Sequence, residues 1–338
     1  MNLNVLSNTE AQLLDNASPA NQARLLGSRV KYLLDTVMAG MGITYYFDPA
    51  NGNDSNDGLS VATAVKSLTT GYGLLRDGYN DTLVYIAGTG SINLSAKLTW
   101  AKSYAHLIGL CSPVGIGNRA RILQTATATG VSPLIDITGS GCVFKNIYVN
   151  QGVADATSKI AVRVTGSRNY FENCHFTGIN NAAQDVSGAS SLNLSGAQEN
   201  LFLNCYVGSD TQTTRGANST ELAIDTASTR NRFLNCLIYA YISHASHALV
   251  TVGALGIDRF MIFDECLFVT DSLNQAVSLT QAFSLPAMTQ GKIILKDCLL
   301  VTDGASGTGA WDATGRGLIW NNTGAPAATA GGGFSTKR

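Results

Sequence analysis

Cysteine is the residue type whose spacing in this chain could carry chemistry. The 338 residues include 7 cysteines, and five of them recur at intervals of 31, 31, 30 and 32 residues: Cys174, Cys205, Cys236, Cys266 and Cys298. Such an array could bind metal or carry redox chemistry. However, no CxxC or Cys/His ligand spacing accompanies it, and the odd total argues against a closed disulfide framework. Ile147 takes the same place one interval earlier and cannot ligate a metal. We therefore expect a structural ladder of buried thiols, with no metal and no cofactor.

Acidic and histidine side chains are the other candidates for chemistry. Cleavage of a polysaccharide needs two carboxylates for hydrolysis, or a base and a cation for elimination. The best acidic group is Asp264, Glu265 and Asp271. The histidines that could supply a base are His175, His244 and His247. None of these histidines has a carboxylate at an obvious register, so the sequence predicts no catalytic residue and leaves the acidic group as the alternative.

Several charged residues are spaced for pairing rather than for catalysis. Oppositely charged residues lie about one interval apart in three cases: Lys145 with Glu172, Asp136 with Arg163, and Asp264 with Lys296. Cross-strand ion pairs of this kind commonly stabilise sheets. We expect these pairs to be structural.

The cysteines mark a repeat, and a period near 31 residues indicates a solenoid. The segments RNYFENCHF (168–176), ENLFLNCYV (199–207) and RNRFLNCLI (230–238) are copies of one motif. Apolar residues stand three before, at, and two after the cysteine position, which one straight strand cannot place on one face. A bend is expected directly before the cysteine, because asparagine tolerates left-handed backbone. The residues at this position are Asn146, Asn173, Asn204, Asn235, Glu265 and Asp297.

A further short strand precedes the motif in every copy. These strands are expected at 134–138, 160–165, 192–196, 222–226, 248–252 and 276–279. Three short strands per period describe an all-β chain that winds as a parallel β-helix. With the earlier turns near 83–87 and 106–110, we expect about 7–8 turns and a length of ~35–40 Å.

Residues 43–87 resemble the entry segment of pectin-lyase-like right-handed parallel β-helix proteins. The resemblance rests on a strand, the loop DPANGNDSNDG (48–58), a helix that caps the barrel, and a first turn that opens near 81–87. It implies the fold, which secreted polysaccharide lyases, hydrolases and phage tailspike-like virion proteins share. The Asp-rich loop could be a calcium site, but it lacks the spacing and the terminal Glu of an EF-hand, so we expect a turn-rich cap.

The expected domains are an N-terminal helical anchor or cap (1–42), an entry cap (43–82), the β-helix (83–302), and a C-terminal cap with a Gly/Ala-rich tail (303–338). In the first segment, Ser18-Pro19 is a good helix start. The apolar residues of that helix that we expect to form an anchor are Leu26, Val30, Leu33 and Val37. The helix either covers the first turn of the solenoid or docks onto a partner, and both interpretations stay open.

Composition excludes several functions. Only 13% of residues are charged, the net charge is −1, and no basic cluster occurs, so nucleic-acid binding is not expected. No apolar run approaches the ~20 residues of a membrane helix. The N-terminus lacks the pattern of a signal peptide, from which we expect synthesis in the host cytoplasm and a final location in the virion.

An apolar stripe is expected on the outside of the last three turns. It comprises Leu237, Tyr239, Leu267, Val269, Leu299 and Val301. A solvated strand face should be polar, so this stripe must be covered. Either residues 303–323, with Trp311 and Trp320, lie over it, or it is a subunit interface; we favour the interface. The resemblance implies parallel homotrimers that associate along such a face.

The sequence thus favours a phage-type virion structural protein: a trimeric capsid decoration (cement) protein or a short spike. Its partners would be two further copies and virion proteins such as the major capsid protein. The alternative is a tailspike or lyase that binds or cleaves polysaccharide, using an outer groove and exposed tyrosines such as Tyr206 and Tyr239. A third hypothesis is a secreted adhesin, which the lack of an export signal disfavours.

Overall fold

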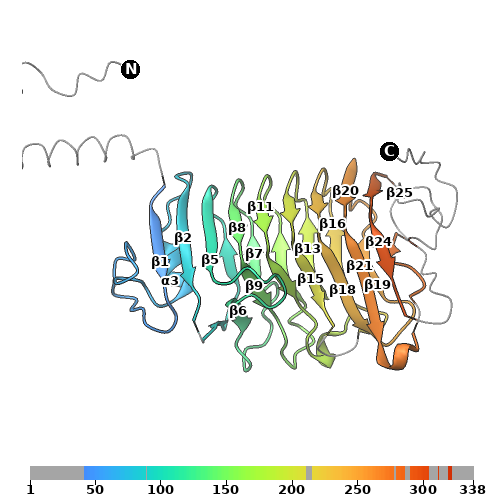
Figure 1. Ribbon diagram of the computed structural model, residues 1–338, viewed down its shortest axis with the longest axis horizontal. Helices are drawn as coiled ribbons and strands as arrows, with labels where there is room; N and C mark the ends of the chain where they lie inside the picture. Colours follow the sequence, from blue (N-terminus) through green and yellow to red (C-terminus); the bar gives the residue numbers. More distant parts are fainter. Residues whose placement is uncertain are drawn as a thin grey trace, which may run out of the picture. The chain divides into compact units, whose positions relative to one another are not determined.

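Three parallel sheets form the walls of the structure, which is a computed structural model (Figure 1). It describes residues 42–88, 90–210, 215–277, 279–285, 290–303, 311 and 319–321. Thr44–Arg338 forms one compact unit and Met1–Ile43 another, and of the latter the structure describes residues 42 and 43 alone. The expected anchor residues Leu26, Val30, Leu33 and Val37 lie outside the described residues.

Each sheet runs along the axis of the coil, and all its strand pairs are parallel. Sheet A contains β1 (Thr44–Phe47), β2 (Asp81–Ile86), β5 (Ala105–Leu110), β8 (Val143–Lys145), β11 (Tyr170–Glu172), β14 (Leu201–Leu203), β17 (Arg232–Leu234), β20 (Phe260–Asp264), β23 (Lys292–Lys296) and β25 (Ile319–Asn321). Sheet B contains β3 (Ile92–Leu94), β6 (Ala120–Gln124), β9 (Ile147–Asn150), β12 (His175–Thr177), β15 (Tyr206–Ser209), β18 (Leu237–Ile242), β21 (Leu267–Ser272) and β24 (Leu299–Val301). Sheet C contains β4 (Leu98–Trp100), β7 (Ile135–Ile137), β10 (Ile160–Val164), β13 (Ser190–Ser195), β16 (Thr220–Asp225), β19 (Ala248–Val252) and β22 (Phe283–Ser284).

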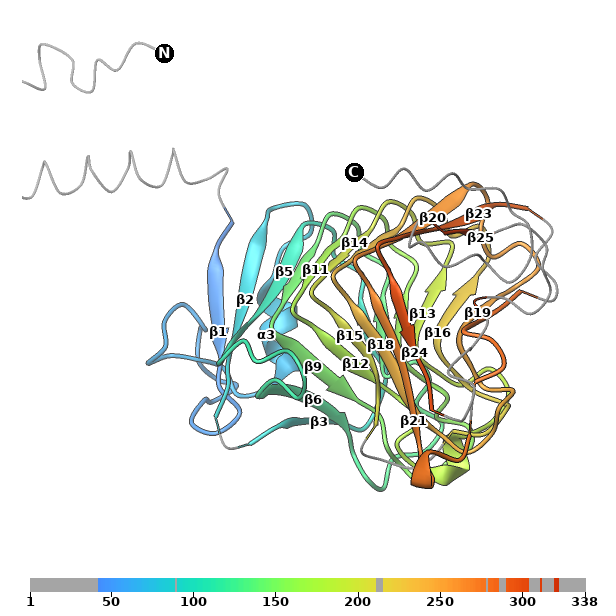
Figure 2. The same cartoon turned by 45° about the vertical axis from the view of Figure 1, so that its right-hand side comes forward.

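The chain passes through sheets A, B and C in turn and so builds a parallel β-helix of about seven turns. Figure 2 shows the three sheets as separate sides of the shaft, with sheet B facing the viewer. This confirms the predicted fold class and the three strands per turn.

The corner between sheets A and B is a single residue in left-handed conformation. Asn146, Asn173, Asn204 and Asn235 have φ of 57°, 52°, 51° and 53°, and the less typical Glu265 has 54°. Asn173 donates from Nδ2 to Oδ1 of Asn146 at 2.8 Å, which links consecutive corners. The predicted bend directly before each cysteine is therefore confirmed.

Aromatic rings and thiols stack behind this corner in the core. Phe144, Phe171, Phe202, Phe233 and Phe263 form one column with ring centroids 4.4–5.0 Å apart and nearly parallel planes. The five repeat cysteines are free and buried. Each thiol lies 3.3–3.5 Å from the carbonyl oxygen of the phenylalanine one turn below. The thiol ladder thus packs in the core, as expected for a structural role.

A second asparagine column forms the corner between sheets C and A. Asn169, Asn200 and Asn231 are buried and hydrogen-bonded from turn to turn. Asn200, for example, donates from Nδ2 to the carbonyl oxygen of Gly166 at 3.1 Å. These side chains satisfy backbone groups that the sharp corner leaves without ladder partners.

The entry segment contains one short helix and a loop rich in turns. Helix α3 (Leu68–Leu74) begins at Ser67, whose side chain accepts a hydrogen bond from the Thr70 N–H. Asp54 accepts from the backbone N–H groups of Lys66 and Ser67, so this carboxylate supports a turn. Two 3₁₀ turns, η1 (Ala182–Gln184) and η2 (Leu273–Gln275), lie further along the chain. Within the described ranges, no helix is long and apolar enough to cross a membrane.

Candidate functional site

The acidic residues considered for hydrolysis lie on different walls of the shaft. Asp264 ends β20 in sheet A, Glu265 forms the corner, and Asp271 lies on β21 in sheet B. Asp264 is 96% buried and is flanked by Arg232 and Lys296, with Lys296 Nζ at 2.8 Å. Burial opposes its ionisation, but hydrogen bonds from these two cations outweigh burial and hold the pKa of Asp264 below its usual value. The structure therefore does not assemble this group into a catalytic pair.

The predicted cross-turn ion pairs all form. Lys145 Nζ lies 2.8 Å from Glu172, and Arg163 Nη2 lies 2.6 Å from Asp136. A different pair, Arg215 with Glu221, was not predicted. Its Nε–Oε1 distance is 2.7 Å, and both side chains are fully buried at the corner between sheets B and C. No sequence signal marks this pair, because both residues lie between the recognisable motifs.

The three candidate histidines divide into one exposed and two buried side chains. His244 is exposed, whereas His175 and His247 are buried. Nδ1 of His247 donates to the Gly216 carbonyl oxygen at 3.0 Å, and burial lowers the pKa of this histidine. Because Gly216 O can only accept, Nδ1 of His247 carries the proton.

The stripe on sheet B is exposed over the last two turns. Leu267, Leu299 and Val301 expose 36%, 59% and 45% of their surface, and Leu237 and Val269 are half-buried. The alternative was that residues 303–323 cover the stripe. Trp311 does not do so, because its ring packs against the core rings of Phe268 and Phe283, with centroids 5.5 and 6.2 Å apart. Residues 304–310 and 312–318 lie outside the described residues.

The expectation that Tyr239 is exposed is wrong, because only 4% of its surface is accessible. It pairs in register with Gly208, which has no side chain, so the tyrosine ring leans over that position toward His175. Its hydroxyl lies 3.1 Å from Nε2 of His175. Burial raises the pKa of Tyr239. Tyr206, the other tyrosine considered for sugar contacts, is half-buried.

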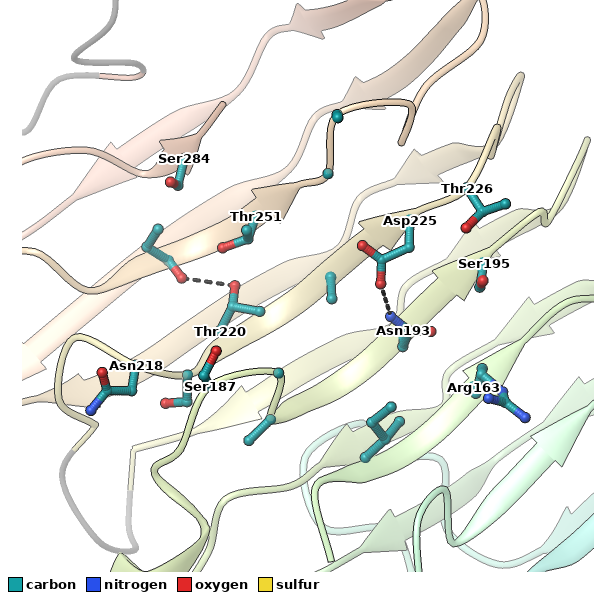
Figure 3. A pocket seen from close by; sticks show the side chains of 18 of the residues that line it. Arg163, Ser187, Asn193, Ser195, Asn218, Thr220, Asp225, Thr226, Thr251 and Ser284 are labelled. Atoms are coloured by element: carbon teal, nitrogen blue, oxygen red, sulfur yellow. Dashed lines mark hydrogen bonds between the residues drawn. The ribbon is translucent and has the colours of Figure 1, made fainter. Parts of the chain in front are cut away.

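A groove of about 840 Å³ follows the outer face of sheet C (Figure 3). Its floor is one register column of outward residues: Arg163, Asn193, Ala223, Thr251 and Ser284. The walls are small polar loop residues such as Ser187, Asn218 and Thr226.

The charged groups of the groove are already engaged. Asn193 donates from Nδ2 to Oδ2 of Asp225 at 2.7 Å, as Figure 3 shows, and Arg163 is paired with Asp136. Neither an aromatic side chain nor a histidine is found among the described residues that line it. This arrangement can hydrogen-bond a hydroxylated ligand but offers no second carboxylate for hydrolysis.

Comparison with solved structures identifies the fold. A pectate lyase, Pel9A, superimposes with a TM-score of 0.58 at 17% sequence identity, covering 82% of this chain and 67% of that one. A rhamnogalacturonan lyase superimposes with a TM-score of 0.51 at 15% sequence identity, covering 78% of this chain and 69% of that one. The chain has the pectin-lyase-like parallel β-helix fold. A phage protein, Geobacillus virus E2 ORF18, gives a TM-score of 0.42 at 13% identity over 88% of this chain and 63% of that one.

The pectin-lyase-like fold confirms the resemblance drawn from residues 43–87. No family model matches the chain. No curated protein matches it either. Solved structures with this fold include polysaccharide lyases. Their sequence identity to this chain is below 20%, so the similarity shows a shared fold and nothing more. In the described part of this β-helix, no group of three His, Cys, Asp or Glu side chains could hold a metal ion.

Proposed function

We propose that this β-helix is a structural protein of a phage-type virion, either a homotrimeric capsid decoration (cement) protein or a short spike. The observation that carries the proposal is the exposed apolar stripe on sheet B. Leu267, Leu299 and Val301 stack on consecutive turns and leave a large part of their surface accessible. A contiguous apolar face of this kind is a typical interaction site.

Three copies packed in parallel around one axis would bring the same stripe of each to the centre. The stripe follows the shaft, so rigid parallel neighbours can cover it over its whole length. Closed rotational symmetry would also leave no copy of the stripe uncovered. Phage tailspike-like virion proteins share the pectin-lyase-like fold, and this is consistent with a place in the virion. In this proposal, residues 1–42 dock onto other virion proteins such as the major capsid protein.

Light scattering tests the trimer. We expect a solution mass near three times 35.5 kDa for the full chain and near 35.5 kDa for Leu267→Asp, because a buried unpaired carboxylate opposes association. Leu255→Asp is the matched control, since Leu255 is also exposed but borders the groove on sheet C. This control should keep the mass of the unmodified protein. A monomeric unmodified chain would refute the trimer.

The place in the virion needs a separate experiment. Particles that lack the protein should lose capsid stability if it is a decoration protein, or adsorption to the host if it is a spike. Unchanged stability together with unchanged adsorption would contradict both forms of the proposal.

The groove on sheet C supports a second candidate function, the binding of a host polysaccharide. Hydroxyl and amide groups line it, and they suit a neutral, extended sugar chain. We expect Ala223→Trp to weaken glycan binding at least ~10-fold by filling the floor. Thr82→Trp on the outer face of β2 should leave binding unchanged. Calorimetric titration with oligosaccharides from the host surface measures both variants, and equal affinities would remove the groove from consideration.

A further inference from the structure

The loop of residues 111–119, between β5 and β6, crosses the outer face of sheet B (Figure 1). We call it the strap. The Gly117 N–H donates to Nδ1 of His175 at 3.0 Å, and Asn118 donates from Nδ2 to the Asn173 carbonyl oxygen at 2.7 Å. Gly115 lies so close to the ring of Tyr206 that any added Cβ would approach the ring within 2.4–2.6 Å. The strap thus sits directly on β12 and β15.

What the strap covers is one end of a continuous column. The outward residues that follow one another in register are Tyr148, His175, Tyr206, Leu237, Leu267 and Leu299. The strap lies over His175 and Tyr206, whereas Leu267 and Leu299 at the other end are exposed. Opening of the strap would therefore lengthen the accessible apolar face from the last turns toward the middle of the shaft.

Neutral His175 is the latch of the strap. A backbone N–H can only donate, so Nδ1 of His175 must be an unprotonated acceptor for Gly117. Nε2 lies 2.9 Å from the carbonyl oxygen of Gly208, which can only accept, so Nε2 carries the single ring proton. Protonation of Nδ1 would place two hydrogen-bond donors opposite each other and so break the hydrogen bond with Gly117.

Within the described residues, the hydrogen-bond partners of the His175 ring are Gly117, Gly208 and Tyr239, and none of them is a carboxylate that would compensate a charged ring. Tyr148 stacks on it at 4.8 Å, and Tyr206 and Tyr239 approach it at 6.1 and 6.0 Å. The charged groups around this site are Arg121, whose guanidinium lies over the Tyr148 ring, and Glu221 and Arg215, which are paired with each other behind Gly208.

We propose that the strap is an acid-sensitive cover: protonation of His175 releases residues 111–119 and uncovers the aromatic end of the column. Burial lowers the pKa of His175 to about 4. An exposed histidine titrates near 6.5, so the open strap binds the proton more tightly than the closed one. The closed state is thus fully favoured above pH 6.5, loses stability as the pH falls from 6.5 to 4, and changes little below 4.

Hydrogen exchange measures strap opening directly. Relative to pH 7, the protection factors of strap amides should fall ~20-fold at pH 5 and ~200-fold at pH 3, from the two pKa values. His175→Gln should abolish this pH dependence, because a glutamine can accept from Gly117 and donate to Gly208 without titrating. His244→Gln, at an exposed histidine, should behave like the unmodified protein. Protection that is equal at pH 7 and pH 4, or a His175→Gln protein with the original dependence, would overturn the proposal.

A pair of glycine variants tests the cover without any titration. Gly115→Ala places a methyl group against the Tyr206 ring, and should open the strap at pH 7. Gly117→Ala introduces similar left-handed strain (φ 67° against 80°) but meets no atom within 4 Å, so it should leave the strap closed. Equal strap protection in the two variants would show that the Tyr206 contact does not hold the strap.

Opening of the strap on protonation of His175 does not depend on the proposed trimer. Only the effect of that opening on assembly rests on the proposed function. Exchange is therefore measured on Leu267→Asp as well as on the unmodified chain. Acid-induced opening in both proteins supports the latch whatever the oligomeric state, and a missing trimer in light scattering bears on the proposed function alone.

Discussion

Replacing Glu221 with glutamine is expected to lower the free energy of unfolding by about 3–5 kcal/mol. Glu221 and Arg215 are fully buried, and Arg215 Nε donates to Oε1 of Glu221 at 2.7 Å. Ser191 Oγ donates to the other carboxylate oxygen, and Arg215 Nη2 donates to the Gly178 carbonyl oxygen at 3.1 Å. Glutamine keeps the shape of the side chain but removes the charge that compensates the guanidinium. Urea unfolding followed by circular dichroism measures the change.

Glu199→Gln is the matched control for this prediction. Glu199 pairs with Arg168 and Arg230, but its side chain is 29% exposed, so its loss should cost about 1 kcal/mol or less. The double variant Arg215→Met with Glu221→Leu should recover much of the loss, because no unpaired charge remains. Equal losses for Glu221→Gln and Glu199→Gln would contradict the assigned burial of the pair.

Replacing Phe202 with alanine is expected to cost about 3–5 kcal/mol, since it opens a cavity in the middle of the phenylalanine column. The Phe202 ring stacks on Phe171 and Phe233 with centroids 4.5 and 4.4 Å apart, and no part of it is accessible. Strands above and below hold the neighbouring rings in register, so the cavity cannot close by a local shift. The same unfolding experiment gives the value.

Leu203→Ala provides the comparison on the same strand. Leu203 is half-buried and faces outward from β14, so its truncation should cost about 1 kcal/mol or less. A Phe202→Ala protein as stable as Leu203→Ala would mean that the column contributes little to the core.

The repeated parts of the fold were predictable because each follows from a local rule applied many times. Asparagine before the cysteine specifies a left-handed corner, and the apolar residues around it specify which faces turn inward. The ion pairs were predictable for the same reason, since Lys145 and Glu172 occupy equivalent places one turn apart. The column of Asn169, Asn200 and Asn231 was equally visible in the sequence, but its role at the second corner was not recognised.

The surface features depended on contacts between segments that share no pattern. Residues 111–119 contain glycine and proline and indicate a loop, yet nothing in them indicates that the loop lies over His175. Tyr239 was expected outside because strand alternation places it there, and the missing side chain of Gly208 lets the ring turn away from solvent. The buried pair of Arg215 and Glu221 also lacks a repeat signal, because it forms within one turn, between the segment that precedes β16 and β16 itself.

The left-handed corners also bear on how such a shaft can change in length. Each corner residue donates its backbone N–H to the turn above, as Asn173 does to Leu203 and Asn204 does to Leu234. The contacts between successive turns are therefore nearly the same at the three motif copies that are most alike in sequence, 168–176, 199–207 and 230–238. Duplication or loss of one 31-residue unit in the gene would add or remove about 4.8 Å of shaft while creating no new kind of junction. Unequal recombination within the coding sequence could then adjust the reach of the protein one step at a time, with both ends unchanged.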